Sequence, residues 1–89
     1  MIPNAQLRDA VERAIERDPR LSLSEIARRA QPPLASATTV ARLLGRIKTS
    51  AYRRNGRDYP ARFRTEIDVE QAARIVHASG IDPIEIDGL

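Results

Sequence analysis

The sequence has no cysteine, no tryptophan and a single histidine, His77. Without cysteine the chain can form no disulfide and no thiolate metal site, and it has no thiol nucleophile. No apolar run approaches the roughly 20 residues that cross a bilayer, and Met1-Ile2-Pro3 does not begin a secretory signal. We therefore expect a soluble cytoplasmic protein that has no membrane partner.

Patterns typical of catalysis are also missing. No recognisable motif links His77 to an acid or to a hydroxyl nucleophile, and the sequence contains no glycine-rich phosphate loop and no suitably spaced metal ligands. Glu66, Asp68 and Glu70 gather around an expected helix start, where the helix dipole accounts for them. We expect no enzymatic activity, no cofactor, no metal and no small-molecule ligand.

What the chain does contain fits one small globular domain. Of its 89 residues, 42% are hydrophobic and 30% are charged. A chain of this size buries only about 60–65% of its unfolded surface, so a large cleft is not expected. Arginine supplies 14 of the 15 basic residues. This bias suits phosphate and guanine recognition, although a GC-rich genome would produce it too.

Charge is distributed unevenly along the chain. Residues 1–41 carry a net charge of +1, residues 42–64 a net charge of +7 and residues 65–89 a net charge of −5. The basic segment, residues 42–64, has one acid, Asp58, and its cations are Arg42, Arg46, Lys48, Arg53, Arg54, Arg57, Arg62 and Arg64. Such polarity directs one face toward a polyanion; the alternative is a merely solvated basic stretch.

Two amphipathic helices are predicted in the first 30 residues. Asn4 is predicted to cap a helix that ends near Asp18-Pro19, because proline cannot continue it. Ser22 and Glu25 form a capping box that begins a second helix, residues 22–30. The apolar faces comprise Leu7, Ala10, Val11, Ala14 and Ile15 in the first helix, and Ile26, Ala27 and Ala30 in the second.

Two further helices are predicted on either side of the most basic stretch. Ser36 or Thr38 caps a helix over residues 36–48, whose core stripe is Val40, Leu43, Leu44 and Ile47. Asp68 caps a fourth helix, which Gly80 ends as a left-handed C-cap residue. Asp82-Pro83 can open one last short turn.

Residues 49–67 are predicted to form a basic β-hairpin, or wing. Asn55-Gly56 lies between two short stretches that contain Tyr52 and Tyr59, and Asn-Gly is the strongest two-residue hairpin signal. The tyrosines are interpreted as cross-strand packing partners rather than base-stacking platforms. Residues 61–67 could continue the second strand, with Phe63 as the wing's anchor in the core. The alternative is a disordered arm that orders on DNA.

The second and third predicted helices carry a family resemblance. Their strings are Ser22-Leu23-Ser24-Glu25-Ile26-Ala27-Arg28-Arg29-Ala30 and Thr38-Thr39-Val40-Ala41-Arg42-Leu43-Leu44. These strings, with the closing segments Ala72-Ala73-Arg74-Ile75 and Ser79-Gly80-Ile81-Asp82-Pro83, resemble the lambda-repressor/Cro-like helix-turn-helix family. The sequence departs from that family in a longer turn at residues 31–37, which lacks the usual glycine, and in a longer stretch at residues 48–67. The second departure suggests a winged variant of the kind found in phage and plasmid regulators.

The resemblance implies a mainly α fold, a helix-turn-helix domain of four to five helices with a β-hairpin wing at about 49–67. It divides the single domain 1–89 into a helix-turn-helix core (22–48), a basic wing (49–67) and a C-terminal helix with an acidic end (68–89). The implied function is that of a small repressor, phage-encoded or bacterial, that binds double-stranded DNA through helix 36–48 in the major groove. The implied base-reading residues are Thr38, Thr39, Arg42 and Arg46. Those implied at the backbone or minor groove are Arg28, Arg29, Lys48, Arg53, Arg54 and Arg57.

Other functions and an oligomeric state stay open at this point. An excisionase-like protein that bends DNA would use the same helix and wing. An antitoxin or adaptor would instead bind a protein partner through the acidic end. RNA binding is not expected, because the basic segment lacks the aromatic surface of single-stranded RNA modules. A homodimer could form through Ile84, Ile86 and Leu89, and monomeric binding is the alternative.

Overall fold

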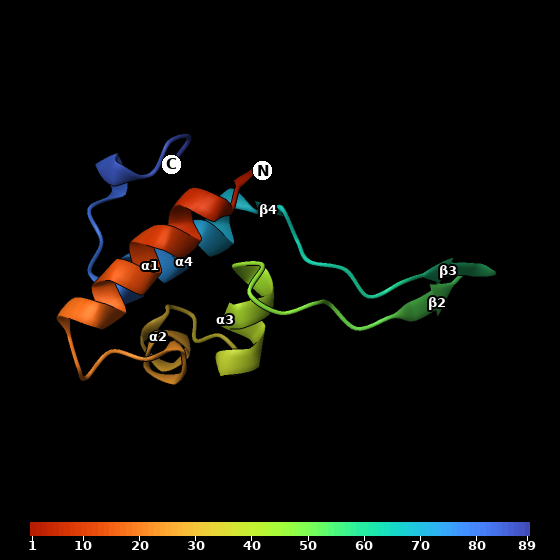
Figure 1. Ribbon diagram of the computed structural model, residues 1–89, viewed down its shortest axis with the longest axis horizontal. Helices are drawn as coiled ribbons and strands as arrows, with labels where there is room; N and C mark the ends of the chain where they lie inside the picture. The colour runs from red at the N-terminus through yellow and green to blue at the C-terminus, as the bar shows by residue number, and fades with distance from the viewer.

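The computed structural model describes residues 1–89 as a helical body from which a two-stranded arm projects (Figure 1). The molecule is accordingly elongated, measuring 44 × 25 × 22 Å. Its elements are β1 (Ile2–Pro3), α1 (Ala5–Arg17), α2 (Leu23–Arg29), α3 (Ala37–Leu43), β2 (Tyr52–Arg54), β3 (Arg57–Tyr59), β4 (Glu66–Ile67), α4 (Val69–Ser79) and the 3₁₀-helix η1 (Pro83–Glu85). The expectation of a mainly α protein with a β-hairpin is confirmed. None of the helices combines the length and apolar character that crossing a membrane requires.

Local sequence accounts for most helix ends. The side-chain oxygens of Ser22, Ser36 and Asp68 accept backbone N–H groups at the starts of α2, α3 and α4, as predicted. Gly80 ends α4 with φ at +70°, the left-handed conformation expected there. Asn4 is the exception, because its side chain caps no N–H of α1. Asn4 does occupy the predicted N-cap position of α1, but its side chain does not make the capping hydrogen bond.

Helix α3 is shorter than the predicted helix over residues 36–48, since it ends at Leu43. Gly45 follows with φ at +74°, which turns the chain out of the helix. Side chains of the first helical region satisfy the last carbonyls: the Asn4 Nδ2 donates to Leu43 O (3.1 Å) and an Arg8 guanidinium nitrogen to Leu44 O (3.2 Å). Ile47 therefore lies outside the helix and is 40% exposed, so its expected place in the core stripe was wrong.

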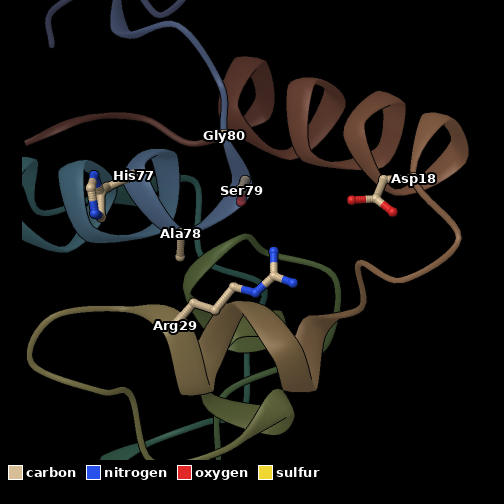
Figure 2. A pocket seen from close by; sticks show the side chains of 6 residues that line it. All are labelled: Asp18, Arg29, His77, Ala78, Ser79 and Gly80. Atoms are coloured by element: carbon tan, nitrogen blue, oxygen red, sulfur yellow. The ribbon is translucent and has the colours of Figure 1, made fainter.

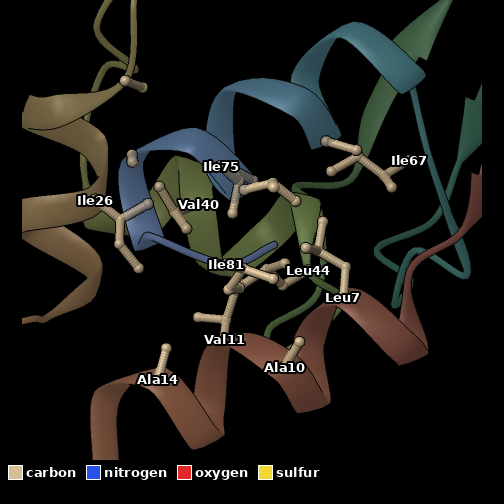
Figure 3. Close-up of a cluster of buried hydrophobic side chains, with 14 of the residues drawn as sticks. Leu7, Ala10, Val11, Ala14, Ile26, Val40, Leu44, Ile67, Ile75 and Ile81 are labelled. Carbon is tan, nitrogen blue, oxygen red and sulfur yellow. The ribbon is translucent and has the colours of Figure 1, made fainter. Parts of the chain in front are cut away.

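The core lies where α1, α2, α3 and α4 meet. Figure 3 shows side chains from these helices converging on one cluster, with Leu7 and Val11 of α1 opposite Ile75 of α4. The cluster holds 19 buried hydrophobic residues, and Ile86 of the C-terminal segment is one of them. Ile86 was expected to be available to a dimer partner, but it packs inside its own chain. Of the other two residues proposed for a dimer contact, Ile84 is 86% exposed and Leu89 is partly buried.

Strand β4 does not extend the hairpin, contrary to the expectation for residues 61–67. It pairs antiparallel with β1 instead, with Ile2 opposite Ile67 and Pro3 opposite Glu66. Ile2 and Ile67 are both buried, so the pairing places two apolar side chains in the core. Phe63 is 53% exposed, and its expected role as an anchor in the core was wrong.

The connection between α2 and α3, residues 30–36, is held in place from both sides. Leu34 is buried, and its N–H donates to Ala27 O at 2.9 Å. From α4, the Arg74 guanidinium donates to the carbonyl oxygens of Pro32 and Pro33, with Nε at 3.1 Å from Pro32 O, and to the Gln71 Oε1 at 2.8 Å. Arg74 thus fixes the position of α2 and α3 relative to α4.

We expect Arg74→Ala to lower the free energy of unfolding by about 1–2 kcal/mol, because it removes charge-assisted hydrogen bonds to two carbonyls. Urea denaturation followed by far-UV circular dichroism measures the change. Arg13→Ala is the matched control, since Arg13 is exposed on α1 and has no ion-pair partner. An Arg74→Ala value within about 0.5 kcal/mol of the parent, as for an ordinary surface substitution, would contradict this role.

Candidate nucleic-acid interface

The arm, residues 46–65, carries most of the basic segment away from the body (Figure 1). At its tip Asn55 and Gly56 adopt φ values of +52° and +74°. Two successive positive φ values are the requirement of the tight hairpin turn that Asn-Gly favours. The predicted hairpin is therefore confirmed, with strands β2 and β3 on either side of this turn.

The hairpin register continues from the tip toward the body. Tyr52 lies opposite Tyr59, and their rings stack with centroids 4.8 Å apart and planes 8° apart. The predicted cross-strand packing of the tyrosines is confirmed. Extending this register places Thr49 opposite Arg62, whose backbones share an N–H···O bond of 2.8 Å. The next pair is Lys48 and Phe63, with the Lys48 Nζ 5.7 Å from the ring centroid.

The register distributes the charges of the hairpin between two faces. In an antiparallel ribbon alternate residues share a face, so Arg54 and Arg57 lie on the same face as the tyrosine pair. Arg53 and Asp58 lie on the opposite face, where Arg53 Nε is 3.6 Å from Asp58 Oδ1. The only acid of the basic segment therefore partly neutralises the face that carries no tyrosine.

A buried asparagine fixes the root of the arm. Asn4 is 2% exposed, and its Nδ2 donates to Arg64 O (2.9 Å) as well as to Leu43 O at the end of α3. The Asn4 N–H also donates to Thr65 O at 3.0 Å. A Cβ on Gly45 would lie 2.4 Å from Arg64 O, so the returning strand of the arm packs directly on the Gly45 backbone. Together these contacts connect α3, the arm and the N-terminus.

The residues predicted to read bases are only partly together. Thr38 is exposed and Thr39 half-buried on α3, and the Thr39 N–H donates to Ser36 Oγ. Arg42 is half-buried, and its Nε is enclosed without a hydrogen-bond partner. Arg46 was expected on the same helix, but α3 ends at Leu43 and Arg46 lies beyond the turn, 3.8 Å from Glu12. That placement of Arg46 was wrong, because the chain turns out of the helix at Gly45.

Most cations of the basic segment have no acidic partner in the chain. Arg46 and Arg53 have one each, in Glu12 and Asp58. The remaining six are Arg42, Lys48, Arg54, Arg57, Arg62 and Arg64. All but Arg42 are exposed. Concentrated positive charge that is not neutralised internally attracts polyanions.

The two arginines of α2 differ from most cations of the basic segment, because both have an acidic partner. Both Arg28 and Arg29 hydrogen-bond and pair with the Glu25 carboxylate. The hydrogen bonds from Arg28 and then Arg29 hold the pKa of Glu25 below its usual value. Glu25 is therefore ionised at neutral pH. The Arg29 side chain also lines a hollow on the side of α1 and α4. Arg29 therefore lies apart from the arm.

That hollow has a volume of about 320 Å³ and is lined by Asp18, Arg29, His77, Ala78, Ser79 and Gly80 (Figure 2). His77 is exposed, and Figure 2 shows it on the other side of the hollow from Asp18. The Ser79 hydroxyl is enclosed and has no hydrogen-bond partner. No three His, Cys, Asp or Glu side chains gather where they could hold a metal ion.

Asn4, Gly45 and Phe63 were not predicted as site residues. The local sequence around Asn4 indicates only a helix cap, because the carbonyl oxygens to which its side chain donates belong to residues 39 and 60 positions away. Gly45 lies inside the third predicted helix, and a glycine there was a usable signal for an earlier helix end. No protein-family model matches this chain, and no curated protein or solved structure matches it either.

Proposed function

We propose that this protein is a sequence-specific regulator that binds double-stranded DNA through α3 and the arm. In this proposal α2 and α3 form a helix-turn-helix unit, with α3 in the major groove. The observation that carries it is the unneutralised positive charge of residues 42–64, where six of eight cations lack an acidic partner. Phosphate groups on DNA would supply the missing counter-charges.

The packing of α2 and α3 supports the helix-turn-helix assignment. α3 packs chiefly against α2, and Ala27 and Ala30 are buried at the end of α2. Small side chains there allow a second helix to cross closely above them. The contacts of Arg74 with the connecting loop give α3 a fixed direction relative to the body. A helix that reads base edges needs such support, because small misplacements forfeit its hydrogen bonds.

The proposal assigns different tasks to α3 and to the arm. Thr38, Thr39 and Arg42 are the α3 candidates for base contacts, and each good bidentate arginine–guanine pair provides about 1–3 kcal/mol of discrimination. Arg54 and Arg57 on the tyrosine face of the hairpin are the candidates for the DNA backbone or the minor groove. Arg46 would have to leave Glu12 to contact DNA.

The test is selection from a random duplex pool, followed by fluorescence-anisotropy titration of the enriched duplex at several salt concentrations. We expect a short enriched motif. Arg42→Ala should weaken binding and relax preference at one or two base pairs, at a cost of about 1–3 kcal/mol. Arg54→Ala should weaken binding to all duplexes alike and reduce the log–log salt slope by about 0.9.

Arg13→Ala on α1 is the matched control and should leave the motif, the affinity and the salt slope unchanged. Enrichment of no motif, with weak binding that Arg42→Ala does not alter, would overturn the proposal of a sequence-specific reader. Loss of binding only in variants that also lose their far-UV circular dichroism spectrum would be a folding defect. Each variant is therefore checked by its spectrum first.

A second candidate, a protein-interaction role at the acidic end, is favoured by one observation. Ile84 is 86% exposed and is surrounded in sequence by Asp82, Glu85 and Asp87. Deleting the end of the chain is an unsuitable test because Ile81 and Ile86 belong to the core. Ile84→Ser removes the exposed apolar group alone. Under this candidate, Ile84→Ser abolishes regulation in cells whereas Arg42→Ala preserves it.

A further inference from the structure

All three aromatic residues of the chain lie outside the core. Tyr52, Tyr59 and Phe63 are 56%, 38% and 53% exposed, and the chain has no tryptophan. Aromatic side chains normally provide large buried areas in a core, which here is built from aliphatic residues alone. Their common place on the most basic part of the chain indicates a surface that contacts a ligand.

The three aromatic residues line one groove. It has a volume of about 610 Å³ and runs from the tyrosine pair along the returning strand of the arm to Met1 at the start of the chain. Tyr59 and Phe63 are four residues apart on an extended chain, which separates them by about 13 Å at roughly 3.3 Å per residue. The groove thus offers two aromatic platforms in succession rather than one pocket. The expectation that the basic segment lacks an aromatic surface was therefore wrong.

Positive charge accompanies these platforms. Arg62 and Arg64 line the groove, and Lys48 lies beside Phe63. None of these three cations has an acidic partner, and Glu66 is the only acid that lines the groove. A ligand that fits must therefore present flat apolar faces and negative charges in alternation.

We propose that this groove binds single-stranded nucleic acid. Bases stack on Phe63 and on the outer side of the tyrosine pair, while Lys48, Arg62 and Arg64 contact the intervening phosphates. Stacking on aromatic side chains next to a basic track is how single strands are held without a need for a particular sequence. In duplex DNA the base faces are covered by their neighbours, so this site is separate from the proposed duplex contacts of α3. It does not depend on those α3 contacts, although Lys48, Arg62 and Arg64 belong to the same unneutralised basic segment.

Intrinsic tyrosine fluorescence tests the proposal directly, because both tyrosines line the groove and no tryptophan obscures them. The probes are an octamer of thymidine nucleotides, the corresponding uridine octamer and an abasic deoxyribose-phosphate octamer of equal charge. We expect the thymidine octamer to quench tyrosine emission and to bind at least 5-fold more tightly than the abasic octamer. The uridine octamer shows whether the groove also accepts RNA.

Phe63→Ala should weaken binding of the thymidine octamer by about 5- to 150-fold, equivalent to roughly 1–3 kcal/mol for one lost stacking platform. Its affinity for the abasic octamer should stay unchanged. Ile84→Ala is the matched control, because it also removes a large exposed apolar side chain but lies outside the groove. Since Phe63 is exposed, the melting temperature of Phe63→Ala should equal that of the parent.

Equal affinity for the thymidine and abasic octamers would overturn the proposal, since it would reduce the groove to a general polyanion site. Quenching by an acidic peptide of equal charge, as strong as that by the thymidine octamer, would overturn it in favour of a protein ligand. Neither result bears on α3, whose proposed role is judged by Arg42→Ala with the selected duplex. Failure of one proposal is therefore distinguishable from failure of the other.

Discussion

Gly45→Ala is expected to lower the free energy of unfolding by about 3 kcal/mol, which combines a left-handed backbone penalty with a steric clash. The glycine has φ at +74°, a conformation that costs an L-residue roughly 1–2 kcal/mol. The added Cβ would also lie 2.4 Å from Arg64 O and 3.0 Å from Asn4 Nδ2. For a domain of this size we expect the melting temperature to fall by roughly 10–25 °C.

Gly80→Ala separates the two contributions. Gly80 has nearly the same φ, +70°, but a Cβ there would meet nothing within 4 Å. Its variant should therefore show only the backbone penalty, about 1 kcal/mol. Thermal and urea denaturation of the two variants measure the difference, which reports the contact between the α3 turn and the arm. Equal losses in both variants would show that this close contact contributes nothing to stability.

Asn4→Ala should lower the free energy of unfolding by about 2–3 kcal/mol, since it leaves two carbonyl oxygens without donors. The Asn4 side chain is the shared donor to Leu43 O and Arg64 O, and it is almost completely buried. The loss should extend to function. Without this bridge the arm is no longer held against the end of α3, so Asn4→Ala should also weaken DNA binding in the anisotropy assay.

Asn4→Asp distinguishes a lost donor from a lost side-chain volume. An ionised carboxylate has nearly the shape of the amide but only accepts hydrogen bonds, and it would face two carbonyl oxygens. Burial near these oxygens raises the pKa of the introduced carboxyl group in the folded state. The variant should therefore be less stable at neutral pH and regain stability relative to the parent as the pH falls, because the protonated acid can donate one bond. A pH-independent difference would contradict the donor role.

Several structural features that depend on neighbouring residues were predicted from the sequence. Ser22 and Asp68 cap helices because their oxygens reach N–H groups two or three residues away. Asn55-Gly56 forms the hairpin turn because both residues tolerate positive φ. The position of the basic segment likewise needs no fold to be recognised.

Features that rest on distant partners could not be predicted in this way. The local sequence indicates that Asn4 is a helix cap. Its side-chain amide instead donates to the carbonyl oxygens of Leu43 and Arg64, which are 39 and 60 residues along the chain. Ile84 and Ile86 are equally apolar and two residues apart, but only Ile86 enters the core. Residues 61–67 were predicted to continue the second strand of the hairpin, because the sequence did not reveal that β1 was the pairing partner of β4.

The sequence by itself therefore determined four helical segments, a hairpin and a concentration of positive charge, all of which follow from periodicity, capping and composition. Only the tertiary structure decided how the arm attaches and that Tyr52, Tyr59 and Phe63 share a groove. The physical reason is that a helix start or a tight turn is stabilised within a few residues. A buried amide between two carbonyls, or an aromatic ring left outside the core, depends on which distant segments the packed chain brings together.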